Sequence, residues 1–157
     1  MKILKSIPYD ELEIGRTATF SKTLTEEDLV LFARTSGDVN PVHLNEEFAK
    51  GTPFKTRIAH GMWSAGLISA ALATVLPGPG TIYLGQNLSF RRPVLLGDAL
   101  TVKLTVSGKQ DEKKWVTIDT EVFNQDDKLV VKGDATVMAP AKSGEVTAPD
   151  LPKVTVG

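Results

Sequence analysis

Residues 62–76 read MWSAGLISAALATVL, and none of these side chains carries a charge. The apolar residues would cover every side of a helix instead of one stripe, and a helix of that kind belongs in the interior of a protein. The segment is too short to span a bilayer and is closed by Pro77. We therefore expect a buried central helix, whose N-terminus presents unpaired N–H groups and a partial positive charge.

Strand patterns dominate the chain after this helix. Between residues 100 and 106, apolar and polar side chains alternate with the period of two that is typical of a half-buried strand. Comparable but weaker patterns define the other expected strands, at 17–21, 84–90, 116–122 and 129–137. Together these patterns predict an α+β architecture in which an antiparallel sheet wraps the central helix.

Composition limits the classes of function. The chain has 157 residues, which indicates one domain, and a net charge of −1, which argues against nucleic-acid binding. It has no cysteine, so disulfides, thiolate metal sites and cysteine nucleophiles are excluded, and its two histidines disfavour a metal site. Residues 1–6 lack the apolar region of a signal peptide, so we expect a soluble, cytoplasmic protein without a membrane partner.

The last part of the chain has a different character. Residues 141–157 are mainly small, polar and interrupted by proline, as in a linker. We therefore expect a folded domain over residues 1–140 and a flexible C-terminal tail or linker over 141–157.

A turn at residues 36–44, SGDVNPVHL, carries the candidate chemistry. Gly37 can adopt a positive φ, and Pro41 fixes its own φ and keeps Asn40 out of the α region. The segment is expected to hold Asp38 and His43 on a stiff, non-helical path where one water molecule could touch both.

Two short helices are expected to support this turn. The first begins with a capping box at Thr25 and ends at Gly37. The second has Asn45 as its N-cap, covers residues 46–50, and ends at Gly51.

Several of these segments resemble one family. SGDVNPVH at 36–43, AHGM at 59–62, GTIYLGQ at 80–86 and FRRPV at 90–94 are similar to the signature of the MaoC-like (R)-specific enoyl-CoA hydratases. The resemblance covers about residues 24–138 and implies a hot-dog fold, a homodimer, and reversible hydration of trans-2-enoyl-CoA. It implies no metal and no redox cofactor, since coenzyme A is part of the substrate. Such domains also occur fused ahead of phosphate acyltransferase domains, and the tail resembles that junction.

The resemblance implies that Asp38 and His43 are catalytic and share one water. Hydration needs a positioned water, a group that takes its proton, and a proton for the α-carbon, and this pair could supply all three. Which of the two takes the proton stays open, and the alternative is a turn-closing Asp38 with a surface His43. Asn40 would orient the pair or a hydroxyl group through its amide. The backbone N–H of Gly61, at the helix start, is the oxyanion candidate, although close packing would equally explain a glycine there.

Three residues are candidates for substrate binding. Ser69 and Leu72 match positions that border the acyl pocket in the resembling hydratases; the alternatives are a back-bonding serine and an ordinary core leucine. Arg91 could bind the phosphates of coenzyme A or simply be solvated. His60 is interpreted as a structural, hydrogen-bonding residue.

Two other functions remain open at this stage. One is an acyl-CoA thioesterase of the same fold, which the Asp–Asn–Pro–His turn argues against. The other is a non-catalytic module that binds acyl-CoA or mediates dimerisation, for which an intact Asp38–His43 pair would be hard to explain.

Overall fold

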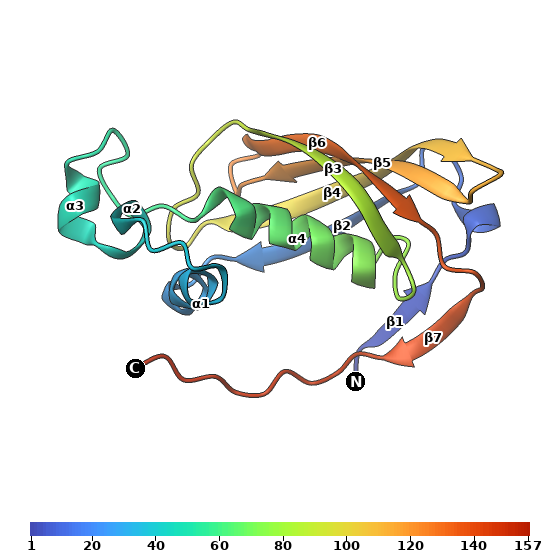
Figure 1. The fold of residues 1–157 in the computed structure, drawn as a ribbon, viewed down its shortest axis with the longest axis horizontal. Helices are drawn as coiled ribbons and strands as arrows, with labels where there is room; N and C mark the ends of the chain where they lie inside the picture. The colour runs from blue at the N-terminus through green and yellow to red at the C-terminus, as the bar shows by residue number, and fades with distance from the viewer.

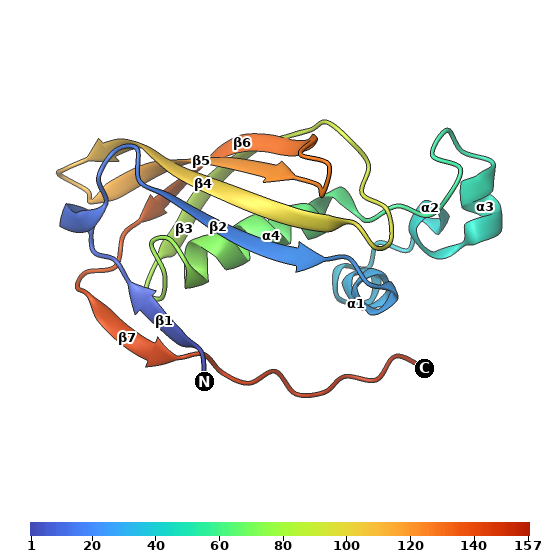
Figure 2. The same ribbon diagram turned by 180° about the vertical axis from the view of Figure 1, so that it is seen from behind.

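The computed structural model describes residues 1–157 and consists mainly of a five-stranded antiparallel sheet that curves around one long helix (Figures 1 and 2). The strands lie in the order β2-β4-β5-β6-β3. Their bounds are β2 Thr17–Thr23, β3 Ile82–Phe90, β4 Ala99–Gln110, β5 Trp115–Phe123 and β6 Leu129–Met138. The central helix is α4, Gly61–Thr74. The predicted α+β architecture and its hot-dog arrangement are confirmed.

Helix α4 and the sheet form the core between them. Along β4, the side chains at 100, 102, 104 and 106 are buried, as their alternation predicts. They pack in one cluster with the buried face of α4, which includes Leu67, Ile68 and Leu72. Full burial of each such side chain contributes about 1.5–3 kcal/mol, so this layer holds the helix in place.

The opposite face of α4 differs from the expectation. Met62 is 56% exposed, Gly66 and Ala73 are also exposed, and Ser69 is half-buried. The sheet covers only one side of the helix, so the prediction of a helix buried on every side is wrong for the single chain. An apolar face is left open.

Helix α1, Glu26–Ser36, lies ahead of the candidate catalytic turn (Figure 1). It starts with the predicted capping box, in which Thr25 and Asp28 each bond the other's backbone N–H, and it ends at Gly37 with a φ of 82°. Helix α3, Glu46–Lys50, is capped by the Asn45 side chain, as predicted.

The turn between these helices contains one more element. Pro41–Leu44 form a single helical turn, α2, so the expected non-helical path is correct only for residues 38–40. Pro41 occupies the first helical position, where its fixed φ favours a helix, and the Asn40 side chain caps the turn by accepting from Val42 N–H.

A separate two-stranded sheet joins the two ends of the chain. β1, Ile3–Ser6, pairs antiparallel with β7, Gly144–Thr147. The expected flexible tail over 141–157 therefore needs correction at 144–147; past β7, Figure 1 shows an extended segment. β1 passes so close to Gly78 that any side chain there would overlap the carbonyl group of Lys5. A short 3-10 turn at Tyr9–Glu11 follows β1. No helix of the fold combines the length and the apolar character that crossing a membrane requires.

Candidate active site

Asp38 follows the end of α1 and keeps one carboxylate oxygen free. Its backbone N–H donates to Ser36 Oγ at 3.1 Å, and its Oδ1 accepts from Asn40 N–H at 3.1 Å. Oδ2 accepts no hydrogen bond from the protein, and the side chain is 47% exposed. The predicted orienting residue Asn40 thus acts through its backbone, while its side-chain oxygen caps α2.

His43 lies in α2 and turns its Nε2 toward that free oxygen. Its Nδ1 is 2.7 Å from the carbonyl oxygen of Ile58, and because a carbonyl only accepts, Nδ1 carries the hydrogen. Nε2 therefore has a lone pair, 3.9 Å from Asp38 Oδ2. A single water with two hydrogen bonds of about 2.8 Å can bridge such a separation. The structure brings the two residues together as the sequence predicted.

His60 stands directly behind the pair. Its ring stacks on the ring of His43 with centroids 3.8 Å apart and planes inclined by 25°. Ligand atoms of Asp38, His43 and His60 lie within 4.8 Å of one another, a composition that could hold a metal ion. Nδ1 of His43 and Nε2 of His60, however, are already committed as donors to the carbonyl groups of Ile58 and Asp38, and the remaining nitrogens belong to two rings stacked on each other. The cluster as it stands does not fit the geometry that a transition metal requires.

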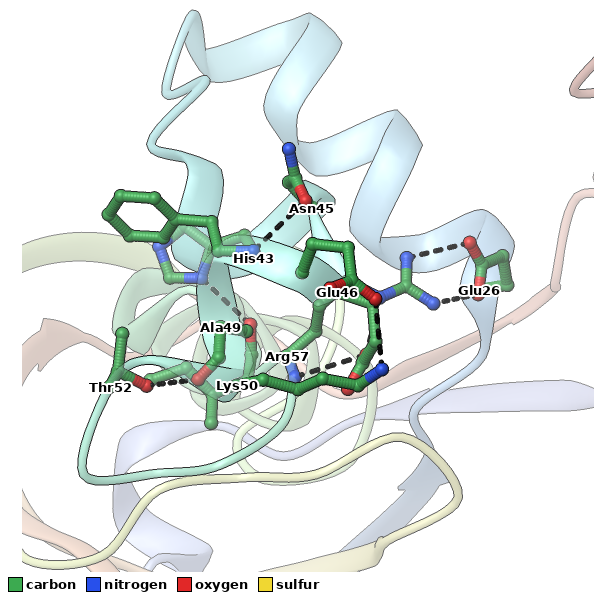
Figure 3. A network of polar contacts seen from close by, with 11 residues as sticks. Glu26, His43, Asn45, Glu46, Ala49, Lys50, Thr52 and Arg57 are labelled. Carbon is green, nitrogen blue, oxygen red and sulfur yellow. Dashed lines mark hydrogen bonds and ion pairs between the residues drawn. The ribbon is translucent and has the colours of Figure 1, made fainter.

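Arg57 fixes the segment that carries these groups (Figure 3). Its guanidinium donates to both carboxylate oxygens of Glu26, at 2.8 and 2.7 Å, and to Glu46 at 3.3 Å. This joins the first turn of α1 to the first turn of α3. The hydrogen bond from Arg57 lowers the pKa of Glu26, and hydrogen bonds from Thr56 and Arg57 lower that of Glu46. We call Arg57, Glu26 and Glu46 the arginine clamp.

A cavity of about 330 Å³ opens beside the two histidines. Its lining includes His43, His60, Gly61, Phe90 and Arg91. Gly61 is the first residue of α4, and no side chain caps that end of the helix, so its N–H has no helical partner. A β-carbon at position 61 would come within 2.9 Å of the Phe90 ring, so a larger residue there would require that exposed ring to shift.

A second, more apolar cavity of about 550 Å³ lies between α4 and β3. Ser69 and Met62 line it from the helix, and Tyr83 and Gln86 line it from the strand. Partial desolvation raises the pKa of Tyr83, and its hydroxyl group donates to Gln86. Leu72, by contrast, is 1% exposed, belongs to the core cluster and lines neither cavity.

Sequence reasoning missed two groups of this region. The carbonyl of Ile58 sets the tautomer of His43, but a backbone acceptor leaves no trace in the residue type. Ser64 is 1% exposed and lines the first cavity. Ser64 follows His60 by four residues, about one helical turn, and this spacing could have indicated that the two residues lie on the same side of the helix.

Comparison with known proteins decides the family. The family model described as "MaoC like domain" matches residues 11–126, well over half of the chain. This chain belongs to the MaoC-like family. The MaoC-like chain is 51% identical over 134 residues to an (R)-specific enoyl-CoA hydratase of Rhodospirillum rubrum, covering 85% of this chain and 92% of that protein. It is 44% identical to a 3-hydroxybutyryl-CoA dehydratase of Methylorubrum extorquens, over 88% of each.

A solved structure resembles the MaoC-like chain over nearly its whole length. The unliganded R-hydratase PhaJ1 of Pseudomonas aeruginosa superposes with a TM-score of 0.95 at 54% identity, covering 99% of this chain and 100% of that one. The likeness thus includes the residues outside the 11–126 match.

Proposed function

We propose that this protein is an (R)-specific enoyl-CoA hydratase that adds water reversibly to trans-2-enoyl-CoA. The observation that carries the proposal is the pair of free acceptors, Asp38 Oδ2 and His43 Nε2, at 3.9 Å. Two acceptors at this distance can each take one O–H of the same water. The water's lone pair is then left for an electrophilic carbon.

The reaction follows from that arrangement. The water oxygen bonds to the β-carbon of the enoyl thioester while Asp38 or His43 takes one of its protons. The electron pair of the carbon–carbon double bond moves through the α-carbon onto the thioester oxygen. Return of the proton to the α-carbon restores the carbonyl group and yields 3-hydroxyacyl-CoA. No redox cofactor is needed, because addition of water involves no net oxidation or reduction, and in this proposal the N–H of Gly61 takes the role of polarising the thioester carbonyl.

The N–H of Gly61 is the group that we assign to the developing charge on the thioester oxygen. It stands at the start of a helix of 14 residues, where the helix dipole favours negative charge, and it lines the same cavity as His43. A preorganised donor of this kind typically contributes 10²-fold to 10³-fold in rate, on the order of 3 kcal/mol.

The two cavities suggest how the substrate lies. Arg91 and Arg92 line the cavity beside His43, and we assign the nucleotide phosphates to that end. The more apolar cavity beside Ser69 suits the acyl chain. Leu72 is buried in the core, so we propose that it affects substrate binding only indirectly, by supporting the position of α4.

We further propose that the active form is a homodimer joined along β3 and α4. β3 is an edge strand, and edge strands present unpaired backbone groups. Exposed apolar side chains cluster on these two elements, namely Met62 56%, Ile82 53%, Tyr83 39%, Leu84 42% and Phe90 52%. A second copy would cover this surface and the open side of α4.

The function is tested with crotonyl-CoA, by following loss of the conjugated enoyl-thioester absorbance and, in parallel, release of free thiol. Asp38→Asn and His43→Ala should each lower kcat by about 10²-fold to 10⁴-fold with little change in KM. Because both groups act on one water, the double variant should be only slightly worse than either single variant. Chiral analysis of the 3-hydroxybutyryl product should give the (R) form.

Asp126→Asn is the matched control, since Asp126 is an exposed carboxylate in the turn between β5 and β6. It should keep the parent rate, and circular dichroism should show the same melting for all variants. Near-parent hydration by folded Asp38→Asn would exclude the shared-water mechanism. Thiol release from saturated acyl-CoA faster than hydration would identify a thioesterase, and inactivity on both would indicate a binding module.

A further inference from the structure

His60 connects three elements at the candidate site although it lies in none of them. It is the residue just before α4 and is only 2% exposed. One face of its ring meets the His43 ring of α2 at 3.8 Å, and Phe32 of α1 packs against it with centroids 4.8 Å apart. These are the two aromatic ring pairs of the protein, and His60 belongs to both.

The hydrogen bonds of His60 fix its tautomer. Nε2 is 3.0 Å from the backbone carbonyl oxygen of Asp38, so Nε2 carries the hydrogen and donates it. Nδ1 is buried without any hydrogen-bond partner, the only buried side-chain nitrogen or oxygen in the protein of which this is true. The ring thus has its one N–H committed to the backbone and a lone pair that faces no protein donor. Neither nitrogen provides a route for a proton to the water between Asp38 and His43.

The same contacts hold both partners of that water. The bond to the Asp38 carbonyl secures a peptide unit in a stretch with no strand or helix to stabilise it, residues 38–40. The stacking holds the His43 ring in the plane in which Nδ1 reaches Ile58 and Nε2 faces Asp38 Oδ2. Loss of either contact would let the 3.9 Å separation vary.

We propose that His60 is a positioning residue of the hydration reaction, which keeps Asp38 and His43 at the separation that one water can bridge and takes no part in proton transfer itself. This inference rests on the proposed hydratase function. It assigns two separable tasks to one ring, a hydrogen bond to Asp38 and an aromatic surface for His43.

Three substitutions separate the two tasks. His60→Gln keeps an N–H donor and removes the ring, His60→Phe keeps the ring and removes the donor, and His60→Leu removes both. A misplacement of catalytic groups by about 1 Å can cost 10²-fold, so we expect kcat on crotonyl-CoA to fall about 10-fold for Gln and Phe and about 10²-fold for Leu. KM should stay within about 2-fold of the parent value, because the interaction lost is one that matters only in the transition state.

The protein offers a direct second readout, because it contains only two histidines. With ¹⁵N-labelled imidazole, the parent should show two rings of opposite tautomer, one protonated at Nδ1 (His43) and one at Nε2 (His60). In each variant the single remaining ring is His43. In His60→Phe, which keeps the stacking ring, it should keep its Nδ1–H form, whereas in His60→Gln and His60→Leu, which both lack that ring, it should exchange between tautomers.

The outcomes decide the proposal as follows. Parent-level kcat in folded His60→Leu, a loss confined to KM, or a His60 ring protonated at Nδ1 would each overturn it. If His60→Leu does not fold, the parent spectrum and the Gln and Phe variants decide. If the parent does not hydrate crotonyl-CoA, the proposed function fails, whereas the tautomers still test whether His60 positions His43.

Discussion

At the scale of single residues, Ser69 is the position where a small change should alter substrate choice. It is half-buried and lines the apolar cavity between α4 and β3. The larger side chain of Ser69→Leu would fill part of that cavity and leave less room for the acyl chain. We therefore expect activity to shift toward short enoyl chains, with crotonyl-CoA turnover partly kept. The measurement is kcat/KM on enoyl-CoA substrates of increasing chain length.

Ser107→Leu is the control for this substitution, because Ser107 is an exposed serine on β4, away from the open face of α4, and lines neither cavity. It should leave the chain-length profile unchanged. An equal loss of Ser69→Leu activity on every chain length, together with a lower melting temperature, would mean that the larger side chain simply overpacks the helix face.

The residues of the site differ in how far the sequence could predict them. The proximity of Asp38 and His43 was predictable because Pro41 shapes the turn between them, whereas their catalytic role was expected from the family resemblance. For His60 the sequence predicted a structural, hydrogen-bonding residue but not its partners, because the ring contacts come from α1 and α2 and depend on how these elements pack. Sequence patterns describe neighbours along the chain, and a ring stacked between distant elements leaves no such pattern.

At the scale of elements, the arginine clamp should make stability depend on pH. The pKa of Glu26 and that of Glu46 are lowered in the folded protein, so the stabilisation is present at neutral pH and is lost as pH falls through the folded-state values. Arg57→Met should therefore melt a few degrees below the parent at pH 7. The difference between the two should shrink toward acidic pH. Thermal melts between pH 7 and pH 3.5 test this.

The matched control is Arg34→Met, since Arg34 is an exposed arginine at the end of α1 and forms no ion pair. Its melting temperature should follow that of the parent at every pH. A difference between Arg57→Met and the parent that is constant over the range would show that Arg57 acts through packing, independently of the two carboxylates.

The small β1–β7 sheet leads to a prediction about truncation. Removing residues 149–157 keeps every β1–β7 pair and should change the melting temperature by no more than about 1 °C, as is usual for surface changes. Removing residues 143–157 deletes β7 and leaves β1 without its partner. Each kcal/mol lost should lower the melting temperature by roughly 2–4 °C. Calorimetry of both truncated chains provides the test, and equal melting of the two would show that β7 does not stabilise the domain.

The two strands of this sheet were not predicted from the sequence, unlike several other elements. The helix caps at Thr25 and Asn45 and the alternation in β4 are local signals, and the structure confirms them. β1 and β7 have four residues each and lie at opposite ends of the chain. Neither is long enough to show a period of two, and only their pairing makes them strands.

At the scale of the whole molecule, the open face of α4 and the β3 edge predict a dimer that charge should disrupt. Met62→Glu combined with Leu84→Glu places two carboxylates on this exposed apolar surface. We expect sedimentation to show a monomer. Hydratase activity is compared in Ile82→Glu, because Ile82 is exposed on the same surface but lines neither cavity, and it should fall with the loss of dimer. Ile14→Glu is the control, because Ile14 is 67% exposed and lies ahead of β2, outside that surface. A parent that sediments as a monomer while fully active would contradict this prediction.

The same face explains why the sequence overestimated the burial of α4. A stretch without charged residues, as at 62–76, is typical of a helix that contacts apolar partners on both sides. One chain supplies only the sheet, on the side of Leu67, Ile68 and Leu72. In the proposed dimer, the second copy would supply apolar contacts on the side of α4 that the sheet of one chain leaves open.

The β1–β7 pairing also brings the two ends of the domain to one corner, where Ala148 N–H donates to the carbonyl of Lys2 at 2.8 Å. Topologically the chain is therefore almost a closed ring. A short linker between residues 148 and 2 could complete that ring, and new ends could be opened at Glu112 and Lys113, in the tip between β4 and β5. Such a circular permutant would keep every strand pairing, because residues 112 and 113 lie outside β4 and β5.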